Sequence, residues 1–156
     1  MYPSLMVERT FVMLKPGALQ RRIVGEVLGR FERKGLKIIA MKMLRMDKAM
    51  AEAHYAEHKG RDYYEKLLDF TMSGPVIAMI IEGEDAILMM RRLAGPVTLM
   101  EQQAGTIRGD YAACTRLNII HSSDSAESAA REKALFFADN EICDWEDGNA
   151  RWFLPG

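Results

Sequence analysis

Residues 76–81 constrain the fold of this chain more than any other segment. They read VIAMII, are apolar at every position and follow the helix-breaking pair Gly74 and Pro75. A strand without a polar side has to be covered on both faces. The run is far shorter than the ~20 residues that a membrane-spanning helix needs. It therefore predicts a buried central strand in a globular domain, with no membrane partner.

The segments before this strand alternate between strand and helix patterns. Residues 10–14 are apolar and predict a first strand that Pro16 ends. Apolar side chains at helical spacing follow within residues 23–31, and Gly35 can end that helix because glycine tolerates a positive φ. Residues 36–44 are rich in Ile, Leu and Met, which predicts the second strand.

Two helices are expected between the second strand and the central one. Asp47 can cap a helix that runs to about Lys59, and Gly60 can end it. Asp62 and Glu65 have the spacing of a capping box for a second, shorter helix. The chain therefore makes a helical excursion before it returns to the sheet.

The C-terminal half repeats the strand and helix order around one long loop. A helix over residues 85–93 is followed by residues 95–115, which have no clear period, and a loop of that length is usually functional. Residues 117–120 predict a short fourth strand. A closing helix is expected over residues 125–137, with Asp124 at the start of another capping-box pattern.

This order of elements predicts an α+β fold of the ferredoxin-like type. In this βαββαβ sandwich, helices lie over one face of a four-stranded antiparallel sheet, and the long loop contributes to the functional site. A chain of 156 residues is long enough for one core and short for two. We therefore expect a single domain over residues 1–156, with residues 138–156 as an irregular C-terminal tail.

Charge and cysteine usage narrow the possible partners. The chain has 22 acidic and 21 basic residues, so its overall charge gives no reason to expect nucleic acid as a partner. Residues 1–7 lack the basic start and apolar core of a signal peptide. Cys114 and Cys143 form neither a disulfide framework nor a closely spaced metal pair. Free thiols and a cytoplasmic location are expected.

His121 is the leading candidate for a nucleophile. No Walker A or GxGxxG motif is present, so side chains would have to hold any phosphate. His121 follows a predicted buried strand and precedes a helix, and a neutral imidazole is a good nucleophile towards phosphorus. Glu132 on the last helix is a candidate to fix its tautomer. A purely structural histidine at a strand end is the alternative.

His54 and His58 suggest a different chemistry. Residues 54–58 read HYAEH, which matches the H-x-x-E-H pattern of inverted zinc peptidases. Such a site also needs a third protein ligand and a general base around an open metal position. A polar face of an amphipathic helix explains the same five residues without any metal.

Three basic residues lie near breaks in the predicted elements. Lys15 ends the first strand, Arg91 lies near the end of a helix, and Arg108 lies in the long loop. Arginine suits bidentate phosphate contacts, and lysine acts as a point charge. Each could equally be a solvated surface charge.

Six segments in the same order give the sequence a resemblance to the nucleoside diphosphate kinases. The resemblance extends from about Glu8 to Phe137, and its most specific part surrounds His121. A non-catalytic protein of this fold would be expected to lack that histidine. The segments are ERTF (8–11), KP (15–16), HYAEHKGR (54–61), SGPV (73–76), GTIRGD (105–110) and NIIH (118–121), which is followed by SDSAESA (123–129).

The resemblance implies a two-step phosphate exchange. The γ-phosphate of ATP or another nucleoside triphosphate would pass to His121 and then to a nucleoside diphosphate, in a ping-pong mechanism. Mg²⁺ would be held through the nucleotide phosphates, without protein side chains as ligands. The family's fold is ferredoxin-like, and its members form homo-oligomers, so a tetramer or hexamer is expected.

The resemblance also implies a role for each site residue. Around the nucleophile, Glu132 and Ser123 would orient His121. Around the nucleotide, the expected contacts are Lys15 and Asn118 to the ribose and the transferring phosphate, Tyr55, Arg91 and Arg108 around the phosphates, and Tyr63 stacked on the base.

The sequence departs from the family pattern in three places. Gly17 replaces the usual Asp after Lys-Pro, and Thr115, opposite Tyr63 in the base slot, replaces an apolar residue. The loop 95–104 keeps its length but loses its usual Thr and prolines. Val97 stands where the family has a phosphate-contacting Thr. We expect a one-residue shift in this loop to bring the Thr98 hydroxyl into that position.

Overall fold

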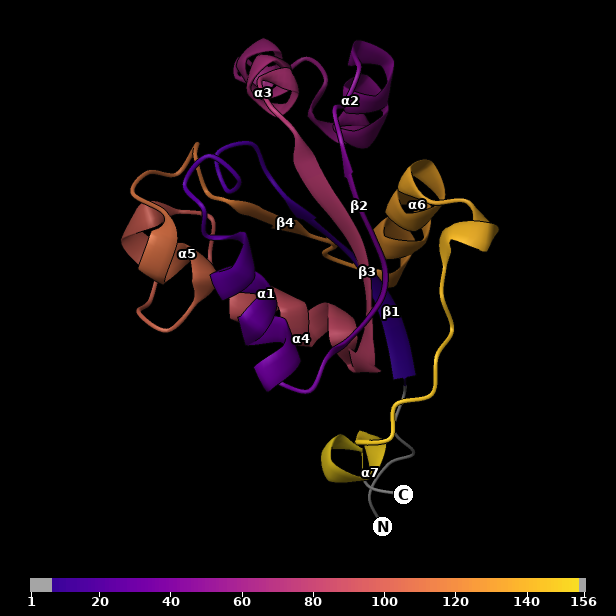
Figure 1. Ribbon diagram of the computed structural model, residues 1–156. Helices are drawn as coiled ribbons and strands as arrows, with labels where there is room; N and C mark the ends of the chain where they lie inside the picture. The colour runs from indigo at the N-terminus through magenta and orange to yellow at the C-terminus, as the bar shows by residue number, and fades with distance from the viewer. Residues whose placement is uncertain (1–6, 155–156) are drawn as a thin grey trace.

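A four-stranded antiparallel sheet with the order β2-β3-β1-β4 forms the centre of the fold (Figure 1). The computed structural model of the chain describes residues 7–154. The order and the antiparallel pairing confirm the predicted ferredoxin-like fold. The strands are β1 (Val7–Leu14), β2 (Lys37–Leu44), β3 (Val76–Glu84) and β4 (Ile120–Ser122).

Helices cover both faces of this sheet, so the prediction that they lie over one face is wrong. In Figure 1, α1 and α4 lie on one side of the sheet and α6 on the other. Within residues 7–154, no helix is both long enough and apolar enough to cross a membrane. The helices are α1 (Val24–Arg33), α2 (Lys48–His54), α3 (Tyr64–Met72), α4 (Ala86–Ala94), α5 (Ile107–Tyr111), α6 (Ala126–Phe136) and α7 (Ala150–Phe153), with short 3-10 turns η1 (Ala56–His58), η2 (Leu99–Glu101) and η3 (Asp139–Glu141).

The central strand β3 explains why both faces need cover. Successive side chains of a strand point to opposite faces. Ile77, Met79 and Ile81 are buried in the core beneath α1 and α4. Ala78 and Ile80 are buried in the second core, which α2, α3 and α6 close. The apolar run 76–81 therefore has a separate core on each side, as its sequence required.

The fourth strand is displaced from its predicted position. It was expected over residues 117–120, but β4 is Ile120–Ser122. Ile119 has φ 74°, which is a strained backbone conformation for a β-branched residue and interrupts the extended run. Leu117, expected inside the strand, is exposed. His121 therefore lies within β4, opposite Met13 of β1, rather than after the strand.

The helix expected from Asp47 to about Lys59 is shorter than predicted. The Asp47 side chain accepts a hydrogen bond from the Met50 backbone N–H, which confirms the cap. The helix ends at His54, and a 3-10 turn follows. Because His58 lies on that turn, the two histidines do not share one helical face.

The two predicted capping boxes are both wrong. Tyr63 occupies the N-cap of α3 and makes no side-chain cap bond. Ser125, rather than Asp124, caps α6, since its hydroxyl accepts from the Ser128 backbone N–H. The long loop also contains α5, whose five residues are too few to show a helical period in the sequence.

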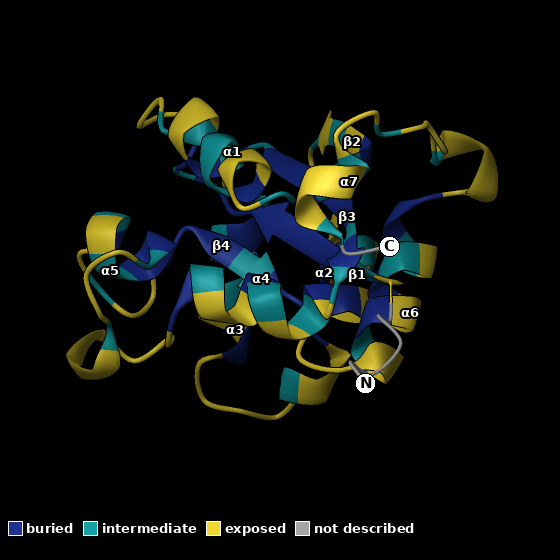
Figure 2. Cartoon of the chain, turned by 90° about the horizontal axis from the view of Figure 1, so that it is seen from below, coloured by how far each residue is buried: buried dark blue, intermediate teal, exposed yellow. Residues whose placement is uncertain are grey.

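The C-terminal tail lies beside strand β2. The backbone N–H of Cys143 donates to the Ile39 carbonyl at 2.8 Å, and the Trp145 indole donates to the Ile38 carbonyl at 3.0 Å. The tail, which was expected to be irregular, contains η3 and α7. In Figure 2 the sheet is largely buried, whereas α7 is mostly exposed.

Candidate active site

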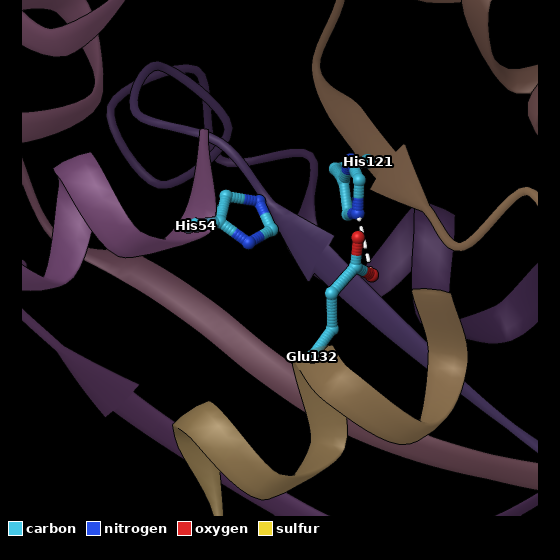
Figure 3. Close-up of side chains that lie close together, drawn as sticks. All are labelled: His54, His121 and Glu132. Carbon is cyan, nitrogen blue, oxygen red and sulfur yellow. Dashed lines mark hydrogen bonds and ion pairs between the residues drawn. The ribbon is translucent and has the colours of Figure 1, made fainter. Parts of the chain in front are cut away.

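His121 is hydrogen-bonded to Glu132 in the middle of α6, and Ser123, which precedes that helix, holds Glu132. The Nε2 of His121 lies 2.9 Å from a carboxylate oxygen of Glu132, which projects from α6 and is buried (Figure 3). The Ser123 hydroxyl donates to the same oxygen at 2.7 Å. An ionised carboxylate only accepts hydrogen bonds, so Nε2 carries the ring proton. The unprotonated Nδ1 then has a lone pair available for nucleophilic attack.

The surroundings of His121 keep its ring neutral. Burial lowers the pKa of His121 and outweighs Glu132, whose hydrogen bond and charge raise it. Lys15 and Arg108 lower the pKa further. A neutral imidazole with a free Nδ1 is the form that can attack phosphorus.

Lys15 is positioned by the strand that precedes it and by Asn118. Its backbone N–H donates to the Ile119 carbonyl at 2.7 Å, and its ammonium donates to the Asn118 side-chain oxygen at 2.8 Å. Asn118 is itself held, since its amide donates to the Thr115 carbonyl at 2.8 Å. Burial, assisted by Arg108, lowers the pKa of Lys15 to about 7.

Arg108 connects the long loop to strand β4, which contains His121. One guanidinium nitrogen donates to the Gly95 carbonyl and another to the Ile120 carbonyl, each at 2.6 Å. Burial, with a smaller effect from Arg91, lowers the pKa of Arg108 to about 10, so the group remains cationic at neutral pH. Arg108, predicted as a phosphate contact, thus also holds two parts of the backbone together.

Tyr55 provides a neutral hydroxyl in the same region. Burial raises its pKa to about 12, so the phenol stays protonated and can donate a hydrogen bond. Its ring contacts His54 at 4.5 Å between ring centroids. Both residues line the pocket that contains His121.

A pocket of about 740 Å³ brings most of the predicted residues together. Ser123 is absent from its wall because it lies beneath, bonded to Glu132. The wall also contains Arg116, Arg131 and Lys66, which were not predicted as site residues. Each of them lies close in sequence to a predicted element or segment. The predicted residues in the wall are Lys15, Tyr55, Tyr63, Arg91, Val97, Arg108, Thr115, Asn118, His121 and Glu132.

The expected shift of the long loop does not occur. Val97 lines the pocket, whereas Thr98 does not. Thr98 is the N-cap of the η2 turn, and its carbonyl accepts from the Glu101 backbone N–H at 2.9 Å. This hydrogen bond fixes the register that the irregular sequence left undefined. The loop therefore presents no hydroxyl at this position of the wall.

Tyr63 and Thr115 also line the pocket, and each is tied to a neighbour. The Tyr63 hydroxyl lies 2.6 Å from Nδ1 of His58. The Thr115 hydroxyl accepts from the Leu99 backbone N–H at 3.2 Å, which gives this polar residue a structural use.

Among residues 7–154, the close group of possible metal ligands contains His54 but not His58. The two histidines of the H-x-x-E-H pattern are therefore not brought together with a third ligand in the part of the chain that the structure describes.

The fold and this pocket define a class of protein, a small α+β phosphotransferase with a half-buried histidine facing a cationic cavity. The family model described as nucleoside diphosphate kinase matches residues 8–142. The chain belongs to the nucleoside diphosphate kinase family.

Relatives and solved structures agree with this assignment. The nucleoside diphosphate kinase of Archaeoglobus fulgidus is 52% identical over 146 residues, which cover 94% of this chain and 97% of the relative. That of Treponema pallidum is 53% identical, with 94% and 98% covered. The structure of a halophilic nucleoside diphosphate kinase from Halobacterium salinarum, in complex with CDP, has a TM-score of 0.92 at 43% identity, with 95% of this chain and 99% of that chain covered.

Proposed function

We propose that this protein is a nucleoside diphosphate kinase that works through a phosphohistidine at His121. In the first step Nδ1 attacks the γ-phosphorus of a nucleoside triphosphate. The N–P bond forms while the bond to the β-phosphate oxygen breaks, and the diphosphate leaves. In the second step a terminal oxygen of another diphosphate attacks the phosphohistidine, and the lone pair returns to Nδ1. The bond from Nε2 to Glu132, which leaves Nδ1 free in a cationic pocket, carries this proposal.

The surrounding side chains supply electrostatic stabilisation and alignment. Phosphoryl transfer develops charge on the equatorial oxygens, so fixed cations and donors around them lower the barrier. Lys15, Arg91 and Arg108 are the proposed cations, and the Tyr55 phenol is the proposed neutral donor. Glu132 and Ser123 act through His121, since they hold its tautomer and orientation.

We propose Mg²⁺ as the cofactor, bound mainly through the nucleotide phosphates. Mg²⁺ prefers six oxygen ligands and commonly takes several of them from substrate phosphates and water. Within the described residues, the one close group of three possible ligands is His54, His121 and Glu132, and two of these would offer nitrogen. This donor set does not suit Mg²⁺, which supports an ion that enters with the nucleotide. When bound, it would neutralise charge on the phosphates.

We propose Tyr63 as the stacking partner of the base. Its exposed ring lies on the pocket wall, and stacking accepts every base because each has a π-face. Thr115 lies in the same wall but its hydroxyl already accepts a bond from the Leu99 backbone. Because stacking is the main contact proposed for the base, weak discrimination among bases is expected.

A homo-oligomer, a tetramer or hexamer, is proposed from the apolar side chains exposed on the edge strand β2 beyond Ile38 and Ile39, where the C-terminal tail is bonded. Met41 and Met43 of the edge strand β2 are 55% and 62% exposed. Large apolar side chains beside unpaired strand groups favour burial against another chain. Light scattering after size exclusion would give the subunit number.

A cytoplasmic location is proposed on the two free thiols, Cys114 and Cys143.

Labelling with γ-³²P ATP tests the proposed function directly. The purified protein should form an acid-labile, base-stable phosphoprotein and discharge the label onto added nucleoside diphosphates. The His121→Ala variant should do neither. Absence of label on the folded wild-type protein, or equal labelling of His121→Ala, would refute the mechanism.

A further inference from the structure

His54 is a buried polar side chain that the proposed reaction does not use. It is 4% exposed and lies at the last residue of α2. Its ring is enclosed by Phe11 and Phe136, with centroid separations of 5.9 Å and 5.3 Å. Neither of its nitrogens has a hydrogen-bond partner among the described residues. Buried polar atoms in this situation call for a ligand, a bound water or an ion.

The unpaired ring faces the nucleophile. The rings of His54 and His121 lie 4.6 Å apart between centroids, at an interplanar angle of 79°. Figure 3 shows His54 turned towards His121 and Glu132 from the opposite side of the site. One ligand atom from each of these three residues lies within 4.8 Å of the other two. Two imidazoles and a carboxylate therefore lie close together in the wall of the pocket.

This donor set matches a known coordination chemistry. Two histidines and a glutamate, with a fourth position open to water, are a common ligand set of zinc. Bonds of about 2.0–2.2 Å at tetrahedral angles place ligand atoms about 3.3–3.6 Å apart. The ligand atoms, which lie within 4.8 Å of one another, would have to close on the ion, and His54 lies at the end of α2, where the chain passes into the 3-10 turn η1.

We propose that His54, His121 and Glu132 form a binding site for a divalent transition-metal ion of the Zn²⁺ class, and that this ion and the phosphoryl group exclude each other at His121. Imidazole nitrogens favour Zn²⁺, Co²⁺, Ni²⁺ and Cu²⁺ over Mg²⁺. The site thus distinguishes an inhibitory ion from the cofactor that the nucleotide would carry.

The protonation states favour ligation. Burial, with a smaller effect from His121, lowers the pKa of His54 to about 2, so its ring is neutral and has a lone pair to offer. The nearby cations Lys15, Arg108 and Arg131 act against a bound cation. A single carboxylate offsets part of that charge. We therefore expect weaker binding than at a structural zinc site, which suits a reversible inhibitor.

Coordination removes the nucleophile whichever His121 nitrogen takes part. If Nδ1 binds the ion, its lone pair is used directly. If Nε2 binds, the ion replaces the proton shared with Glu132, and the neutral ring then carries its proton on Nδ1. In both cases no lone pair remains for attack on phosphorus.

The composition of the chain allows a clean binding test. It contains three histidines and two cysteines. In a Cys114→Ser, Cys143→Ser background, Zn²⁺ affinity is measured by competition with a chromophoric chelator, without nucleotide or Mg²⁺. We expect one ion per chain. His54→Phe should weaken binding by about tenfold or more, a loss that even partners which only orient a ligand can cause. His58→Ala is the matched control and should leave Zn²⁺ affinity unchanged.

Two further measurements keep the test decisive. Thermal unfolding identifies a misfolded His54→Phe protein, in which case His54→Gln replaces it. Co²⁺ should give the visible spectrum of a low-symmetry nitrogen site, and this spectrum should disappear after His121 is phosphorylated. Absence of Zn²⁺ binding in the thiol-free protein, equal affinity in folded His54 variants, or loss of binding in His58→Ala would overturn the proposal. The metal site itself does not depend on the proposed function; only its mutual exclusion with phosphate does. If the protein bound Zn²⁺ through His54 but was not labelled by ATP, the proposed function would be rejected and the metal site would be retained.

Discussion

Replacing Glu132 by Gln tests the part of the site that selects the reactive nitrogen. The substitution keeps the length of the side chain but removes the charge that accepts from Nε2 of His121 and from the Ser123 hydroxyl. Hydrogen bonds to charged groups contribute about 1.5–3 kcal/mol. If that contribution is fully expressed in the transition state, phosphorylation of His121 should slow by about 10- to 150-fold.

The pH dependence of Glu132→Gln provides a second, independent test of the role of this carboxylate. Activity needs neutral His121, so its protonation produces the acid limb of the pH profile. Burial lowers the pKa of His121, and Glu132 opposes this effect by stabilising the imidazolium. Without the carboxylate charge the pKa of His121 falls further. The acid limb of Glu132→Gln should therefore move to lower pH even though the maximal rate is smaller.

Stopped-flow phosphorylation by ATP, followed across pH, measures both effects at once. Glu127→Gln is the matched control, because Glu127 is exposed in the first turn of the same helix and is absent from the pocket wall. Its rate and pH profile should equal those of the wild type. A change below about threefold in Glu132→Gln, or an acid limb that moves to higher pH, would refute the proposed role of this carboxylate.

Three further outcomes are expected. His121→Ala should abolish phosphate exchange with little change in thermal unfolding, and robust turnover by the pure variant would reject the nucleophile. Specificity constants for different bases should differ by less than about a hundredfold (about 2.7 kcal/mol), because stacking on Tyr63 reads no hydrogen bonds, and a larger ratio in coupled assays would mean that the base slot is misassigned. Val97→Thr should raise kcat/KM by up to about tenfold through one added hydrogen bond to phosphate, whereas Thr98→Val should be silent. The reverse order would show that the loop shifts when nucleotide binds.

Several features were set by local sequence because the physical cause is local. The side-chain oxygen of Asp47 reaches the backbone of its own helix, and the positive φ of Gly35, 89°, is needed at the turn where it occurs. The unbroken apolar run of β3 required cover on both faces wherever the helices came from. Ordered motif segments around His121 were enough to identify the family.

Tertiary structure decided what depends on contacts between distant segments. The strained φ of Ile119 sets the start of β4 and so places His121 inside the strand, opposite β1. The η2 turn is hydrogen-bonded to Thr115 through the Leu99 backbone N–H, and in this arrangement Val97 lines the pocket. His54 and His121 come together because both rings pack against Phe11 of β1, although 67 positions separate them in the sequence (121 − 54). Periodicity and capping patterns report interactions within a few residues, whereas packing across the sheet determines which side chains meet.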